Sequence, residues 1–297
     1  MKRFISIIFI ISGLIAHPSW AITITHDGTI YFVDVLHNET GTLWRLSKDL
    51  KLTAVLTDFH SHDFHVDKDG ILWIAQAIWK TGSVEGEGIN LLFRFDPKTE
   101  KLDTIIETRD WDLFYGSAIA MSSTNKSVYF SIHDRILRKD LNGSTHFEID
   151  QVFGHVNDLA LDKNGVLWIT DTQKDNGAVY KWSNNKLELV ATQLLKANHA
   201  EPIFEEKRHQ FLSALVFDEQ NRPYVSDNYK RQICRIDRSG PKLIYQSEKS
   251  WYPAGFCFDR NSALIIMETG WGRGALGPRI IRYNLQTQKK EIICDKL

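Results

Sequence analysis

The chain has 297 residues, of which 43% are hydrophobic, so it is long enough and apolar enough to bury a large core. Lysine and arginine together number 36 and aspartate and glutamate 37, which gives a formal net charge of −1. No basic stripe runs along the sequence, so we do not expect nucleic acid as a partner.

Residues 1–21 are typical of a secretory signal peptide. Lys2-Arg3 precedes the apolar run Phe4–Ile15, which matches a charged n-region and a short h-region. Cleavage is expected after Ala16, or after Ala21 with Ser19 at the small −3 position. The alternative is a short membrane anchor, but the run is shorter than a membrane-spanning helix requires. We therefore expect a secreted or periplasmic protein with no stable membrane span.

A hairpin-like unit recurs six times in the rest of the chain. In VNDLALDKNGVLWITD (Val156–Asp171), an alternating stretch is followed by the Asn164-Gly165 turn and by a β-branched and aromatic run. The six copies span Ser19–Asp34, His62–Ala75, Ser117–Ser131, Val156–Asp171, Ser213–Asp227 and Ala254–Glu268. Residues equivalent to Asp162 follow one another at intervals of 42, 55, 40, 56 and 41 residues. Six residues after these positions, or seven in the third copy, stand Tyr31, Trp73, Tyr129, Trp168, Tyr224 and Ile265. Such a period, with several strands per unit, is typical of a β-propeller.

Two further strands follow each hairpin, so every repeat supplies four antiparallel strands. In chain order they are expected at Thr42–Leu46 and Leu52–Leu56, Asn90–Phe95 and Leu102–Ile106, Arg135–Lys139 and His146–Ile149, Ala178–Trp182 and Lys186–Val190, Gln232–Asp237 and Lys242–Tyr245, and Arg279–Tyr283 and Lys289–Cys294. Surplus residues form loops at Ala77–Asn90 and Leu194–Gln210. The sequence predicts an all-β fold, one six-bladed β-propeller of four-stranded antiparallel blades over residues 22–297. Because the chain starts on an inner strand and ends on an outer one, the ring should close by packing between the first and last blades.

The three cysteines, Cys234, Cys257 and Cys294, are interpreted as small apolar residues. The predicted strands of Cys257 and Cys294 are too far apart for a disulfide, and Cys234 has no evident partner. Their spacing is not that of a metal site.

Stacking the repeats gathers two sets of side chains at one mouth of the central channel. The residues equivalent to Asn157 are Trp20, His62, Ser117, Asn157, Ser213 and Ala254, hereafter the inner ring. Two residues earlier, on the same strand face by alternation, stand Pro18, His60, Tyr115, His155, Phe211 and Tyr252. Polar groups on such an apolar frame suit a small-ligand pocket, with Trp20, His60, Tyr115, Ser117, His155, Ser213 and Tyr252 as candidate ligand-binding residues. The alternative is that they satisfy backbone groups or pack at the entrance.

Asn157-Asp158 and the following LALDKNGVLWITD resemble a motif of the gluconolactonase / senescence marker protein family, and of the related paraoxonases and NHL-repeat propellers. The repeats cover essentially the mature chain. The resemblance implies that Asn157 ligates a divalent cation, Ca²⁺ or Zn²⁺, in the axial pocket, and that His62 resembles a paraoxonase mouth histidine. A lactonase of this kind uses the cation to polarise a carbonyl and a nearby acid or histidine as base. The candidate catalytic residues are therefore His62 and Asp158.

The sequence departs from the rest of that family's metal set. The first-blade Glu falls at Ser19–Trp20, the second Asn near Ser213 and the Asp near Ala254, whereas Ca²⁺ requires several oxygen ligands. Asp158 points to the opposite face of the strand from Asn157 if that strand is regular.

Two functions remain open at this point. The first, which we favour, is an exported, monomeric propeller that binds a small molecule at the axial mouth or uses the loops at Ala77–Asn90 and Leu194–Gln210 for recognition. The second is a metal-dependent hydrolase of lactones or related esters, with three histidines replacing the lost oxygens around a softer metal such as Zn²⁺.

Overall fold

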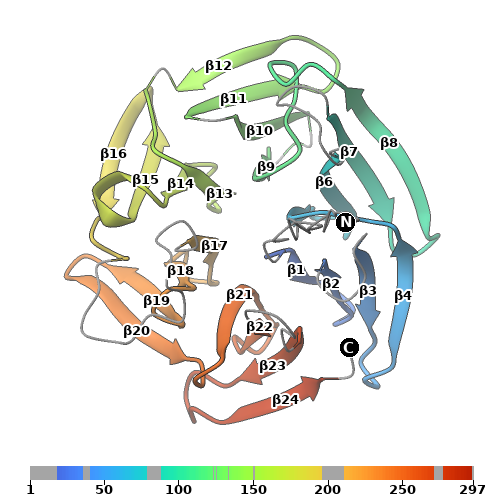
Figure 1. Cartoon of the computed structure of the whole chain (residues 1–297), viewed down its shortest axis with the longest axis vertical. Helices are drawn as coiled ribbons and strands as arrows, with labels where there is room; N and C mark the ends of the chain where they lie inside the picture. Colours follow the sequence, from blue (N-terminus) through green and yellow to red (C-terminus); the bar gives the residue numbers. More distant parts are fainter. Residues whose placement is uncertain are drawn as a thin grey trace, which may run out of the picture.

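The chain folds into six sheets arranged as a ring around a central channel (Figure 1). The computed structural model describes residues 19–35, 41–78, 88–122, 124, 126–132, 134–149, 151–195, 211–270 and 277–295. Each sheet consists of four antiparallel strands that follow one another in the chain, and its first strand lies nearest the channel. The one helix in these residues is a 3₁₀ turn, η1 (Lys174–Asn176). The predicted all-β, six-bladed propeller is confirmed.

The strands lie where the repeat pattern predicts them. Blades 1 to 3 comprise β1 (Ile22–Ile24), β2 (Ile30–Asp34), β3 (Thr42–Leu46), β4 (Leu52–Thr57), β5 (Asp63–Val66), β6 (Leu72–Ile78), β7 (Ile89–Asp96), β8 (Lys101–Thr108), β9 (Ile119–Met121), β10 (Ser127–Ile132), β11 (Arg135–Asp140) and β12 (Thr145–Ile149). Blades 4 to 6 comprise β13 (Val156–Leu161), β14 (Leu167–Asp171), β15 (Ala178–Ser183), β16 (Lys186–Ala191), β17 (Leu212–Phe217), β18 (Pro223–Asp227), β19 (Gln232–Asp237), β20 (Gly240–Gln246), β21 (Trp251–Phe258), β22 (Leu264–Gly270), β23 (Arg279–Tyr283) and β24 (Lys290–Cys294). Residues 1–18, 79–87 and 196–210, which hold most of the expected signal peptide and most of the two expected loops, lie outside the described residues.

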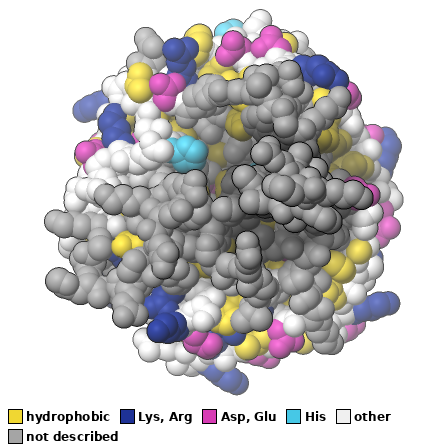
Figure 2. Space-filling model, in the orientation of Figure 1, with side chains coloured by type: hydrophobic (Ala, Val, Ile, Leu, Met, Phe, Trp, Pro, Cys, Tyr) yellow, Lys and Arg dark blue, Asp and Glu magenta, His cyan; other side chains and the backbone are white. Residues whose placement is uncertain are grey.

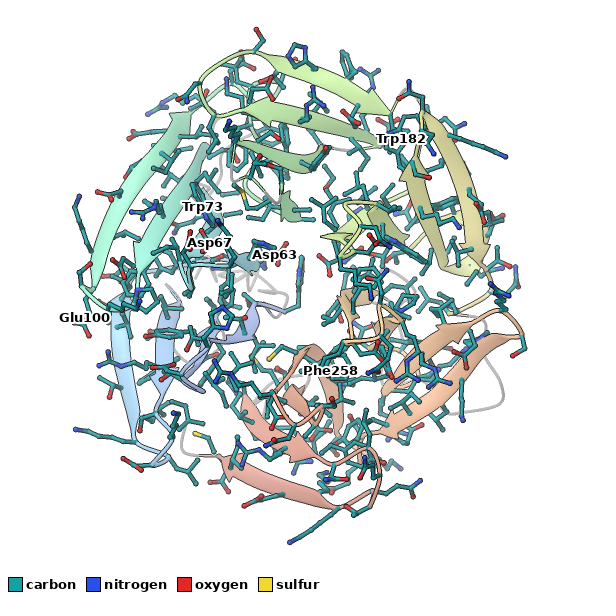
Figure 3. The ribbon with its side chains drawn as sticks, turned by 180° about the vertical axis from the view of Figure 1, so that it is seen from behind. Asp63, Asp67, Trp73, Glu100, Trp182 and Phe258 are labelled. Atoms are coloured by element: carbon teal, nitrogen blue, oxygen red, sulfur yellow. The ribbon has the colours of Figure 1, made fainter. Side chains whose placement is uncertain are left out.

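A carboxylate at the tight turn explains why an aromatic residue recurs six positions later. One oxygen of Asp67 accepts the backbone N–H groups of Asp69 and Ile71, at 2.9 and 3.0 Å, and the other accepts the indole N–H of Trp73 at 3.0 Å. Asp67 and Trp73 lie together on blade 2 (Figure 3). The same pairing recurs as Asp162 with Trp168 and Asp218 with Tyr224. In these blades the aromatic side chain therefore ties the second strand to the turn that precedes it.

The ring closes by packing between blades 1 and 6. Phe32 of β2 and Met267 of β22 belong to one buried apolar cluster that both blades share. Gly255 on β21 lies so close to blade 1 that a Cβ there would overlap the carbonyl oxygen of Trp20. All four strands of blade 6 are consecutive, so in the described residues closure depends on side-chain packing, as predicted. All three cysteines are free and buried.

Charged side chains of both signs are spread around the rim of the face shown in Figure 2, with hydrophobic side chains between them. In the part of the chain that the structure describes, no helix has the length and apolar character needed to cross a membrane.

Candidate functional site

A cavity of about 410 Å³ opens where the inner strands begin, and the whole inner ring lines it. Its lining includes Trp20, His62, Ser117, Asn157, Ser213 and Ala254. Four residues of the second set also line it: Tyr115, His155, Phe211 and Tyr252. Pro18 lies outside the described residues, and His60 contacts the lining residue His62. The cavity therefore takes at least one residue from every blade.

Bulges in three inner strands place ring residues at the cavity. Where the first two strands of blades 4, 5 and 6 pair, the register skips one residue on the inner strand. The skipped residues are Asn157, Ser213 and Ala254, each the ring residue of its blade. A bulge leaves its extra residue outside the ladder and re-aims the side chain. Regular alternation, on which the expected orientation of Asp158 rested, does not hold at these positions.

Aromatic rings form much of the cavity wall. Trp20 stacks on His62, with ring centroids 5.4 Å apart and 25° between the planes. Trp111 and Tyr115, from the connection between β8 and β9, have their centroids 5.0 Å apart. Tyr252 adds a fully buried aromatic side chain. Flat apolar surfaces of this kind bind the faces of ring-shaped ligands.

The histidines at the mouth are held in defined arrangements. The Nε2 atoms of His60 and His62 are 3.0 Å apart, so one ring donates its proton and the other accepts it. Burial lowers the pKa of His60 below its usual value. Burial also lowers the pKa of His155, against the smaller, opposite effect of the Asp171 carboxylate. At both His60 and His155, burial therefore favours the neutral imidazole.

The amide of Asn157 is oriented by a chain of hydrogen bonds. The backbone N–H of Leu212 donates to Oγ1 of Thr172 at 3.2 Å. The Thr172 hydroxyl in turn donates to Oδ1 of Asn157 at 2.8 Å. Oδ1 of Asn157 is thus bound to Thr172, the residue that follows β14. The Nδ2 group is the part of the amide available to the cavity.

Asp158 does not line the cavity; it links two blades. Its carboxylate accepts the backbone N–H of Leu215 on the next inner strand at 2.6 Å and that of Leu159 at 2.8 Å. Asp63 stands at the same position of blade 2, beside the channel (Figure 3), and accepts the N–H of Ile119 at 2.9 Å. Burial raises the pKa of Asp63 to about 7. Burial, and to a smaller extent the nearby Asp63 carboxylate, raises the pKa of Asp158 well above its usual value.

The donor set at the inner ring does not fit the divalent cation that the resemblance implies. Oδ1 of Asn157 accepts the Thr172 hydroxyl, and both oxygens of Asp158 accept backbone N–H groups away from the lining. The other ring positions carry no carboxylate, whereas Ca²⁺ sites usually include several. Among the described residues, no three His, Cys, Asp or Glu side chains are grouped to hold a metal ion.

Several lining residues were not predicted from the repeats. Trp111 lies in a connection outside the repeat register, so stacking the hairpins gives no signal for it. Ser131 and Asn228 lie at the ends of second strands, and aligning those ends would point to them. Gly116 also lines the cavity, and a Cβ there would overlap the carbonyl oxygen of Gln76. Only glycine lets the chain pass over the end of β6 at this point.

Comparison with known proteins identifies the fold. No family model and no curated protein matches the chain. Among solved structures, virginiamycin B lyase from Staphylococcus aureus is 14% identical with a TM-score of 0.56, over 94% of this chain and 85% of that protein. A protein assigned as a gluconolactonase is 14% identical with a TM-score of 0.57, over 84% and 85%. An auxiliary nutrient binding protein from Bacteroides ovatus is 11% identical with a TM-score of 0.58, over 84% of this chain and 66% of its own. What these proteins share with the chain is the propeller fold.

Proposed function

We propose that this propeller binds an uncharged small molecule in the cavity at the mouth of its channel. The observation that carries the proposal is that all six inner-ring residues line one cavity of about 410 Å³, a volume within the range of small-molecule sites. None of its described lining residues is Asp, Glu, Lys or Arg. A charged ligand would therefore enter this site without an opposite charge in its described wall, at a large cost in desolvation.

Binding is tested by calorimetric titration with a panel of neutral sugars and cyclic dipeptides. The variants are Asn157→Ala and His62→Ala, with Asn261→Ala, on an exposed turn remote from the cavity, as the matched control. Each cavity variant should weaken binding about tenfold or more, because it removes a hydrogen-bonding side chain from the site. Asn261→Ala should leave affinity unchanged. If these cavity variants have a lower melting temperature but unaltered affinity, Asn157 and His62 have a purely structural role.

Hydrolysis of lactones or related esters is the second candidate function, supported by the His60–His62 pair. When His62 donates its Nε2 hydrogen to Nε2 of His60, 3.0 Å away, its Nδ1 carries the lone pair that a general base needs. The test follows acid release from glucono-δ-lactone in a pH-stat. A base role predicts that His62→Ala lowers the rate by about 10²-fold or more. Equal rates of acid release for wild type, His62→Ala and buffer would rule out hydrolysis as a function of this site.

We also propose export, with cleavage after Ala16 rather than after Ala21. Ser19 is buried, and its Oγ accepts the backbone N–H of Ala21 at 3.1 Å. Trp20 lines the cavity, and its backbone N–H donates to the carbonyl of His62 at 3.3 Å. Cleavage after Ala21 would remove all of these contacts. Mass spectrometry of exported protein should find a mature chain that begins at His17, and a chain that begins at Ile22 would contradict this choice.

A further inference from the structure

We propose that Asn157 recognises its ligand as a hydrogen-bond donor, through Nδ2, and that the cavity binds without a divalent cation. The occupant is an uncharged ring compound that carries acceptor oxygens, the chemistry shared by neutral sugars and cyclic amides. This inference rests on the proposed function and adds to it the class of ligand and the role of one residue.

The hydrogen bonds of Thr172 determine the orientation of the Asn157 amide. The hydroxyl of Thr172 already accepts the backbone N–H of Leu212, and it gives its single hydrogen to Oδ1 of Asn157. If the amide were reversed, Nδ2 would face that hydroxyl as a second donor. The hydroxyl hydrogen would then lose its acceptor in a buried position, which is unfavourable. The hydrogen-bond network therefore fixes Oδ1 on Thr172 and leaves the two Nδ2 hydrogens for the cavity.

Another donor belongs to Trp20, which lines the same cavity. The indole N–H of Trp20 is buried, and within the described ranges no acceptor is bonded to it. Buried donors are normally satisfied, and an acceptor oxygen of a bound ligand would satisfy this one if the indole turned toward the cavity. A ligand that pairs with the Nδ2 group of Asn157 and the indole N–H of Trp20 would therefore carry acceptor oxygens.

The described lining of the cavity lacks the carboxylates that a cation would need. Ring positions beside Asn157 hold the Ser213 hydroxyl, which is 3.0 Å from the Ser226 hydroxyl, and the apolar Ala254. In the described lining no carboxylate faces the cavity, and a hard cation is poorly bound by amide and hydroxyl groups alone. The stacked pair Trp20–His62 and the pair Trp111–Tyr115 instead offer flat surfaces for an uncharged ring.

The experiment measures the affinity of wild-type protein for cellobiose and for cyclo(glycyl-glycine) in the presence of excess EDTA, then with CaCl₂ or ZnCl₂ in its place. Each probe represents one source of the shared chemistry, so the tighter one identifies the source. We expect the same affinity with chelator as with either cation. Asn157→Asp, which keeps the size of the side chain and its acceptor for Thr172 but removes the donor, should weaken binding about 10- to 100-fold.

Thr172→Val is the second variant, because it removes the hydroxyl that orients the amide without touching the cavity lining. It should weaken binding less than Asn157→Asp does, and Thr172→Ser should recover the loss by restoring the hydroxyl. If EDTA abolishes binding to wild type, or if Asn157→Asp keeps its affinity and binds Ca²⁺, the inference is wrong while the proposed function stands. If neither probe nor any neutral sugar or cyclic dipeptide binds wild type, the proposed function fails and this inference falls with it.

Discussion

Asp227 shows how one buried carboxyl group at the end of β18 makes stability depend on pH. The group is almost completely buried, and it accepts the backbone N–H of Lys230 at 3.0 Å and the side-chain amide of Gln232 at 3.3 Å. Burial raises its pKa to about 7, against the smaller, opposite effect of Lys230. Its neighbour Asn228 lines the cavity, so this corner also positions part of the site.

The pKa of Asp227 predicts that its contribution to stability declines as pH rises. The folded protein keeps the Asp227 proton over a range, from about 4 to about 7, in which the unfolded chain has already lost it. The free energy of unfolding therefore falls across this range. Asp227→Asn cannot ionise, so its melting temperature relative to wild type should be higher at pH 8 than at pH 5. Parallel melting curves of both proteins across this range would show that Asp227 does not titrate as described.

At the scale of elements, the repeated hairpin is a turn held by a carboxylate and an aromatic donor. Asp67 accepts two backbone N–H groups of its own turn and the indole N–H of Trp73 from the strand that follows. Both side chains are buried, so a partner left unpaired there loses its hydrogen bond without gaining water. The pairing therefore couples turn geometry to strand register.

This coupling can be measured with a double-mutant cycle. Asp67→Ala and Trp73→Phe should each lower the free energy of unfolding by about 1–3 kcal/mol, because each leaves a buried group unpaired. The double variant should lose less free energy of unfolding than the two single variants lose together, by about 0.5 kcal/mol or more. The reason is that the hydrogen bond shared by the two residues is lost only once. As a control, Trp73→Phe combined with Asp259→Ala, in the turn of blade 6, should be additive. Additivity in both pairs, measured by urea unfolding, would show that the bond does not couple Asp67 to Trp73.

The elements were predictable because each hairpin carries its own signal. Alternation, turn residues and the aromatic position are local in sequence, and six copies reinforce one another. The inner ring could be predicted for the same reason, since equivalent positions of equivalent strands lie at the same end of the channel. The bulges at Asn157, Ser213 and Ala254 could not be, because register depends on pairing with a second strand. The Thr172–Asn157 bond and the position of Trp111 likewise depend on how separate segments pack.

At the scale of the whole molecule, Gly255 controls how closely blades 1 and 6 approach. A Cβ at this position would overlap the carbonyl oxygen of Trp20, so the backbones of the two blades meet only because the side chain is absent. Gly255→Ala should therefore lower the free energy of unfolding by about 1–3 kcal/mol, as overpacking usually does. It should also weaken binding, because the residue it displaces, Trp20, lines the cavity.

Gly143→Ala provides the control for this prediction. Gly143 lies on an exposed turn, and a Cβ there would be 3.4 Å from the nearest side-chain atom, an ordinary contact. Chemical denaturation should place Gly143→Ala within about 0.5 kcal/mol of wild type. If Gly255→Ala is as stable as the control and binds as tightly as wild type, the seam between the blades is looser than the structure indicates.

The construction of each blade from one continuous piece of chain also shapes how the protein folds. Every strand pairs with the strand next to it in sequence, so each sheet forms from contacts of low contact order, which cost little loop-closure entropy and favour rapid formation. The seam between β1 and β21 is different, because it joins opposite ends of the described chain. The cavity takes residues from all six blades and so exists only after that seam has closed. Closure of this seam therefore completes the site, and a bound ligand would stabilise the closed ring.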